Sequence, residues 1–232
     1  MSKVLHREHR ALFLLLSILL FFVLNPFLQD SHTGEGFLVA SLYLTLVAAT
    51  LELAEKKVLF WTALPIAVAS MILLFFSHIY FYQVLELRLA SSVVLVVFLG
   101  LVSTALFIYL LRPGAITTGR LYVSVGLYFL LGLFWYVLYG LVDIIQPGSF
   151  AEAHIPLVGR IEPAKLLYFS LATLTTLGYG DIVPLKPAAR ILAVLEAAAG
   201  VLYIAIFVAS LVASYQSANH KSAGLMSDER AS

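Results

Sequence analysis

The sequence predicts an all-α membrane protein, in which six spanning helices are accompanied by a short re-entrant helix and loop. Composition is the first observation, since hydrophobic residues make up 62% of the 232 positions and charged residues only 12%. A soluble domain is about one quarter charged. The net charge of +1 gives no reason to expect a nucleic-acid partner, and the absence of cysteine excludes disulfides and thiolate metal sites.

The spacing of apolar runs is the second observation. A helix needs about 20 apolar residues to cross roughly 30 Å of hydrocarbon. Six segments qualify: Ala11–Leu28, Phe37–Leu53, Val58–Ile79, Leu89–Leu111, Leu121–Ile145 and Ala188–Tyr215. The first follows a basic stretch, as in a signal peptide, but no small-residue cleavage pattern comes after it, so we expect it to be retained.

Basic residues predict the orientation, because they favour the cytoplasmic side of a membrane. With the N-terminus inside and six spans, nine Lys and Arg residues lie on the inner side: Lys3, Arg7, Arg10, Lys56, Lys57, Arg112, Arg120, Lys221 and Arg230. Five lie on the outer side: Arg88, Arg160, Lys165, Lys186 and Arg190. We therefore expect a multi-pass protein of the plasma membrane, surrounded by lipid, with both termini in the cytoplasm.

A boundary follows the fourth segment, where Pro113 and Gly114 should end the helix. It divides the chain into a front part of four spans (1–111), a linker (112–120), a second part (121–215) and a short cytoplasmic tail (216–232). The fourth span has no Arg or Lys between Leu89 and Leu111. Voltage sensing needs several charges in the field, since one charge crossing 100 mV contributes only about 2.3 kcal/mol. We expect the front part to lack a working voltage sensor.

The second part contains an outer helix (121–145), a short helix (164–175) and an inner helix (188–215). Pro163 suits the first position of the short helix, where its missing N–H leaves nothing unpaired. About three turns are too short to cross the membrane, and glycines follow, so we expect a re-entrant segment. The carboxyl end of this helix would point toward the middle of the membrane, where its partial negative charge favours a cation.

The nonapeptide TLTTLGYGD, residues 173–181, follows this helix. A Thr-x-Gly-Tyr-Gly run at membrane depth stacks carbonyl oxygens that replace the water around a potassium ion. At this point the chain resembles the tetrameric potassium channel family, sharply over Pro163–Tyr215 and only in architecture before Arg112. The resemblance implies a homotetrameric pore that conducts K⁺ passively. It implies no enzyme chemistry, no cofactor and no known protein partner.

The same resemblance implies that residues 176–180 form the selectivity filter. Ions would be bound by the hydroxyl of Thr176 and the carbonyls of Thr176, Leu177, Gly178 and Tyr179, with Gly180 completing the loop. Both glycines can adopt positive φ at little cost, which lets successive carbonyls point at one axis. Leu177 departs from the family pattern, where valine is more usual, but it would contribute only a carbonyl.

Other residues would support the filter. By resemblance, Tyr168 could hydrogen-bond Asp181 and brace the loop, or it could simply pack. Glu196 is an acid inside the last span, where a charge is costly and usually faces protein or water. We expect it to contact hydroxyls of the short helix, such as those of Thr173 or Thr175, either as a structural brace or as a pH sensor.

Gly200 lies where the inner helix of related channels commonly bends, so the resemblance suggests a gating hinge. The alternative is that this glycine only permits close helix packing. Ile204, Val208 and Val212 follow at four-residue spacing and therefore share one face, which we interpret as a cavity wall.

Three rival functions remain. Residues 178–181 also match the Gly-x-Gly-Asp signature of intramembrane aspartyl proteases, with Asp143 as the partner of Asp181. Asp143 is near the outer end of its span, however, and the later Pro-Ala-Leu motif is missing. Transporter subunits of channel ancestry repeat the pore segment, whereas it occurs once here. Non-selective cation channels usually lose the tyrosine or the second glycine, and both are present.

Overall fold

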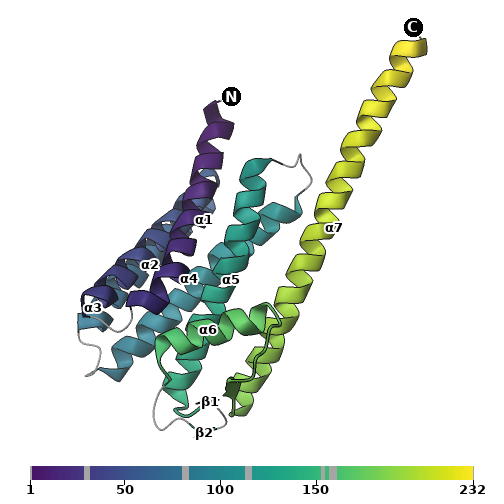
Figure 1. Cartoon of the computed structure of the whole chain (residues 1–232). Helices are drawn as coiled ribbons and strands as arrows, with labels where there is room; N and C mark the ends of the chain where they lie inside the picture. The colour runs from purple at the N-terminus through teal and green to yellow at the C-terminus, as the bar shows by residue number, and fades with distance from the viewer. Residues whose placement is uncertain are drawn as a thin grey trace.

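The computed structural model describes residues 2–28, 32–79, 84–112, 117–152, 155–156 and 161–231. The helices are α1 (Ser2–Leu28), α2 (His32–Glu52), the 3-10 turn η1 (Leu53–Glu55), α3 (Lys57–Ile79), α4 (Leu85–Leu111), α5 (Thr118–Ile145), α6 (Pro163–Leu174) and α7 (Pro187–Ala231). Three short strands are β1 (Phe150–Glu152), β2 (Ile155–Pro156) and β3 (Ile182–Pro184). Figure 1 shows α6 beside α5 and α7, and the end of α7 projecting beyond the other helices.

Six of these helices, α1 to α5 and α7, are long and apolar enough to cross a membrane. The predicted class, a largely helical membrane protein with six spans, is therefore confirmed. The helices begin one to nine residues earlier than the apolar pattern indicated, because hydropathy marks only the part inside hydrocarbon. At α5, for example, the Thr117 side chain caps the helix by accepting the backbone N–H of Arg120 at 3.3 Å.

The predicted end of the inner helix at Tyr215 is wrong, since α7 continues to Ala231. The expected tail, 216–232, is therefore mostly helix. The tail contains polar residues, which interrupt the apolar pattern but do not interrupt the helix, and no proline follows Pro187. Of the predicted linker, residues 113–116 lie outside the described part of the chain.

The sequence did not predict the small antiparallel sheet, which has the order β2-β1-β3. In the pairing of β1 with β3, Phe150 lies opposite Pro184 and Glu152 opposite Ile182. Strands of two or three residues are too short to show a periodic pattern. The sheet joins the segment that precedes α6 to the segment that precedes α7. It therefore lies beside the glycine-rich loop, residues 176–180, which connects α6 to β3.

The apolar interior consists of two clusters that meet along α5. The larger one packs α1, α2, α3 and α4 against α5, with Leu14, Leu46 and Phe98 fully buried. The smaller one surrounds α6 and contains Tyr139, Phe150 and Phe169, whose rings lie 5.0 to 5.7 Å apart. This aromatic group fixes the middle of α6 against α5 and the sheet.

Candidate functional site

The site is built on α6, which begins with Pro163 and ends at Leu174, within one residue of the predicted bounds. Helix α6 packs against both α5 and α7. Leu166, Phe169 and Leu174 bury its apolar face. Its carboxyl end therefore has a fixed position, from which the glycine-rich loop starts.

Backbone N–H groups of the loop are hydrogen-bonded to the last turn of α6. The N–H of Thr176 donates to the carbonyl of Thr173 at 2.9 Å, and those of Leu177 and Gly178 donate to the carbonyl of Ala172 at 2.8 and 3.2 Å. Among the described residues, no donor reaches the carbonyl oxygens of residues 176–180. The first half of the loop thus uses its N–H groups within the chain and leaves its carbonyl oxygens available.

Every second residue of the loop has positive φ: 57° at Thr176, 53° at Gly178 and 79° at Gly180. Such alternation of backbone handedness directs successive peptide groups to the same side of the chain. The two glycines suggested this conformation in advance, whereas Thr176 did not. A β-branched residue with positive φ is strained by about 1–2 kcal/mol. The hydrogen bonds to Ala172 and Thr173 flank this residue and hold it in place.

The loop is exposed in the single chain. All residues from Thr175 to Asp181 are exposed, including 53% of Leu177 and 70% of Tyr179. Non-helical backbone at membrane depth is tolerated only where protein covers it or a water-filled cavity meets it. At membrane depth, such a loop would need water or further protein against it.

Two polar contacts connect α6 to the neighbouring segments. A hydrogen bond between the Tyr168 hydroxyl and the Asp181 carboxylate raises the tyrosine pKa, and Asp181 also accepts the N–H of Ile182 at 3.1 Å. Near the start of α6, Lys165 donates to Glu152 of β1 at 2.8 Å, which raises the lysine pKa. The segment after the loop and the sheet are thus both attached to α6.

Glu196 of α7 is fully buried and contacts two hydroxyl groups. Its Oε2 lies 2.5 Å from the Tyr139 hydroxyl of α5, and its Oε1 lies 2.6 Å from the Ser170 hydroxyl of α6. The Ser170 hydroxyl also lies 2.8 Å from the carbonyl of Gly132 on α5. One carboxyl group therefore joins α5, α6 and α7.

The expected contact between Glu196 and a hydroxyl of the short helix is present, but Ser170 makes it, and the named candidates Thr173 and Thr175 do not. The hydroxyl of Thr175 donates to its own helix, at the Leu171 carbonyl 2.7 Å away. Thr175 also lies five residues after Ser170, or about 7.5 Å further along the helix axis. Sequence reasoning missed Ser170 and Tyr139 because both stand within apolar helices and carry no distinguishing local pattern.

Gly200 is the point of closest approach between α7 and the end of α6. A Cβ atom at this position would overlap the carbonyl oxygen of Leu174. That same oxygen accepts the Tyr128 hydroxyl at 3.2 Å. The structure thus gives Gly200 a packing role, and α7 is one continuous helix. The gating hinge stays a prediction.

The predicted cavity wall lies beyond Gly200 on α7. Ile204 and Val208 are each 51% exposed. The side chain of Val212 lies outside the described part of the structure. The exposed apolar face of α7 has room for further protein beside it.

The two aspartates of the protease hypothesis have different surroundings. Asp143 is 1% exposed and accepts the backbone N–H of Ile161 at 3.1 Å. Asp181 is exposed and is engaged by Tyr168 and Ile182. The two carboxylates thus accept different backbone N–H groups, whereas an acid dyad would require them to share a proton.

Comparison with known proteins gives one match. A family model described as an ion channel matches residues 123–217, which comprise most of α5, all of α6 and the loop, and α7 as far as Ser217. No curated protein and no solved structure matches the chain. Residues 123–217 therefore form an ion channel domain, and six apolar helices make the protein a membrane protein. The match does not extend to α1–α4.

Proposed function

We propose that this protein is a potassium-selective channel, in which residues 176–180 form the selectivity filter. The observation that carries the proposal is the orientation of the N–H and C=O groups of the loop. The N–H groups of Thr176, Leu177 and Gly178 bond to α6, while the carbonyl oxygens of residues 176–180 have no donor among the described residues. Positive φ recurs at every second residue of the loop. Such a row of oxygens can replace the hydration shell of K⁺.

The proposal requires four copies of the chain around one axis. One row of oxygens contacts an ion from one side only, whereas a dehydrated cation needs oxygens all around it. The exposure of the loop and of one face of α7 supports such an assembly, because identical neighbours would cover both. Each α6 would then contribute the negative end of its dipole toward the axis.

Within this assembly, we assign a proton to Glu196 by counting donors. Three contacts require three protons: Tyr139 with Glu196, Ser170 with Glu196, and Ser170 with the carbonyl of Gly132. The two hydroxyls supply two. A neutral Glu196 that donates to Ser170 supplies the third, and it avoids the cost of a charge inside the membrane. The result is a hydrogen-bonded chain from Tyr139 to Gly132 that holds α6, and with it the filter.

Opening of the proposed channel should depend little on the membrane voltage. Helix α4 has basic residues only at its ends, Arg88 in the first turn and Arg112 directly after it, so the hydrocarbon region of the helix carries no gating charge. Current recorded from a planar bilayer at −100 to +100 mV should show open probability that changes little with voltage. Steep activation would contradict this part of the proposal.

The decisive experiment is ion flux into liposomes that contain the purified protein, with K⁺ or Na⁺ as the permeant ion, together with the mass of the assembly in detergent. We expect a tetramer and a reversal potential that follows the K⁺ gradient. Equal permeation of both ions would favour a non-selective cation channel. A monomer, or cleavage of a membrane peptide that depends on Asp143, would exclude the proposed pore.

A further inference from the structure

A pocket of about 480 Å³ lies between α3 and α4, outside the ion channel domain. Lys56, just before α3, and Arg112, just after α4, line it at one end. Apolar side chains, including Leu59 and Leu101, line the remainder. Leu101 precedes Arg112 by eleven residues, so the pocket extends roughly 16 Å from the membrane face toward the bilayer centre.

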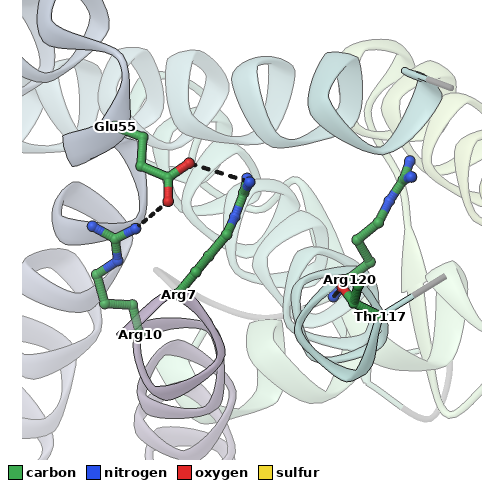
Figure 2. Close-up of polar contacts among 5 residues, drawn as sticks. All are labelled: Arg7, Arg10, Glu55, Thr117 and Arg120. Atoms are coloured by element: carbon green, nitrogen blue, oxygen red, sulfur yellow. Dashed lines mark hydrogen bonds and ion pairs between the residues drawn. The ribbon is translucent and has the colours of Figure 1, made fainter. Parts of the chain in front are cut away.

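The two basic residues face this pocket without a carboxylate partner among the described residues. Glu55, the neighbour of Lys56 in the chain, is already paired with Arg7 at 3.2 Å and with Arg10 at 2.7 Å, as Figure 2 shows. Burial, and the positive charges of Arg112 and Arg7, lower the pKa of Lys56. An anion in the pocket would relieve this repulsion.

Two neighbouring features strengthen the positive potential at the same end. Arg120 donates to the carbonyls of Leu110 and Arg112 at 2.8 and 2.7 Å, which brings a further guanidinium to the end of α4. Helix α3 begins at Lys57 and has 23 residues, so the partial positive charge and the free N–H groups of its first turn lie beside the pocket.

The surroundings of the pocket indicate a lipid. Ile108 and Thr104 continue the wall along α4, within a predicted span. On α3, Val58 is 79% exposed and Trp61 is 68% exposed, which is typical of a surface in contact with lipid. A soluble anion would leave the apolar wall without a partner, whereas an acyl chain would cover it. Volumes of 300–1,000 Å³ are typical of small-molecule sites.

We propose that this pocket binds an anionic phospholipid, with its phosphate between Lys56 and Arg112 and an acyl chain along Leu59, Leu101 and Ile108. A zwitterionic lipid would leave the excess positive charge only partly balanced. This site is independent of ion selectivity, because it lies on helices that the ion channel match does not include.

Native mass spectrometry of the intact, detergent-purified protein tests the proposal. The protein is titrated with phosphatidylglycerol or with phosphatidylcholine of the same acyl chains, and bound lipids are counted. Each favourable charge contributes about fivefold in affinity. The double variant K56Q/R112Q should therefore lose about 25-fold of its affinity for phosphatidylglycerol and bind phosphatidylcholine as before.

The matched control is Lys57→Gln, since Lys57 is the adjacent exposed lysine and does not line the pocket. It should retain the wild-type preference for the anionic lipid. Equal losses for this control and the double variant would mean a general surface effect and overturn the proposal. An unchanged preference for the anionic lipid in the double variant would also overturn the proposal. Displacement of the lipid by soluble glycerol phosphate would overturn it too, because it would identify a site for the headgroup alone. Absence of lipid from the wild-type assembly would indicate that a second copy covers the pocket, and would also overturn it.

Discussion

The front helices and the ion channel domain differ in where their polar side chains form hydrogen bonds. In α1–α3, most buried hydroxyls donate to a carbonyl three or four residues earlier in their own helix, as do those of Ser17, Thr45, Thr50 and Ser70. Tyr43, which donates to Met71 of α3, is an exception. In α5–α7, the bonds of Ser170, Tyr139, Tyr128 and Tyr203 join different helices, at sequence separations between 26 and 79. The hydroxyls of Ser124, Thr175 and Ser210 still donate within their own helices.

This difference has a physical consequence. A hydroxyl bonded to its own helix is satisfied wherever that helix lies, so it imposes no position on a neighbour. A bond between helices is lost when either one shifts, and nearby hydrocarbon offers no replacement. We infer that the ion channel domain is held in one arrangement, while the front helices are held mainly by apolar packing. The four predictions that follow test this contrast.

The largest effect is expected for Gly178→Ala. Alanine at φ of 53° costs about 1–2 kcal/mol in each copy of the chain and would turn a carbonyl away from the pore axis. We expect loss of K⁺ flux in liposomes. Gly140→Ala, in the second half of α5, is the control, because its Cβ would meet nothing within 4 Å. Wild-type flux in Gly178→Ala would contradict the proposed filter.

A large effect is also expected for Gly200→Ala. The added methyl group would overlap the Leu174 carbonyl, so α6 and α7 must separate at a cost of about 1–3 kcal/mol. Thermal unfolding of the assembly should therefore occur at lower temperature, and flux should fall with it. If stability stays at the wild-type value while only the open probability changes, Gly200 acts as a hinge rather than a packing site.

An intermediate effect is expected at Glu196, where two substitutions separate the possible roles. Glu196→Ala leaves the Tyr139 hydroxyl without its partner, whereas Ser170 keeps its contact with the Gly132 carbonyl, so the cost should be about 1–3 kcal/mol. Glu196→Gln retains an acceptor and a donor, so it should conduct normally if the wild-type acid is neutral. Flux measured across pH provides the readout. The sensing hypothesis is removed if Gln and wild type respond to pH identically.

The smallest effect is expected for Lys165→Gln, which breaks the contact with Glu152. Both side chains are partly exposed, so the loss of stability should be below about 1 kcal/mol. Because the hydrogen bond to Glu152 raises the lysine pKa, the contribution is complete below the ordinary lysine pKa and disappears as pH rises through the folded value. Unfolding curves of the variant and wild type should therefore converge at strongly alkaline pH. Lys186→Gln, at an exposed lysine, should have no such effect.

Local properties of the sequence predicted much of the site. Hydropathy identified the six spans because the bilayer requires long apolar helices. Pro163 marked the start of α6, since its ring fits only the first turn. Gly178 and Gly180 indicated the left-handed positions of the loop because few other residues adopt them. Each of these features depends on the residue itself or on its immediate neighbours.

Only the tertiary structure decided the partners of Glu196, the role of Gly200 and the positive φ of Thr176. Tyr139 and Ser170 lie 57 and 26 residues from Glu196, and no local pattern encodes such a separation. The carbonyl beside Gly200 belongs to another helix, and Thr176 is held in its conformation by bonds to the preceding turn. The sequence by itself determined which segments enter the membrane and where the backbone can turn. Packing decided which groups meet, because contacts between distant segments exist only once the helices are assembled.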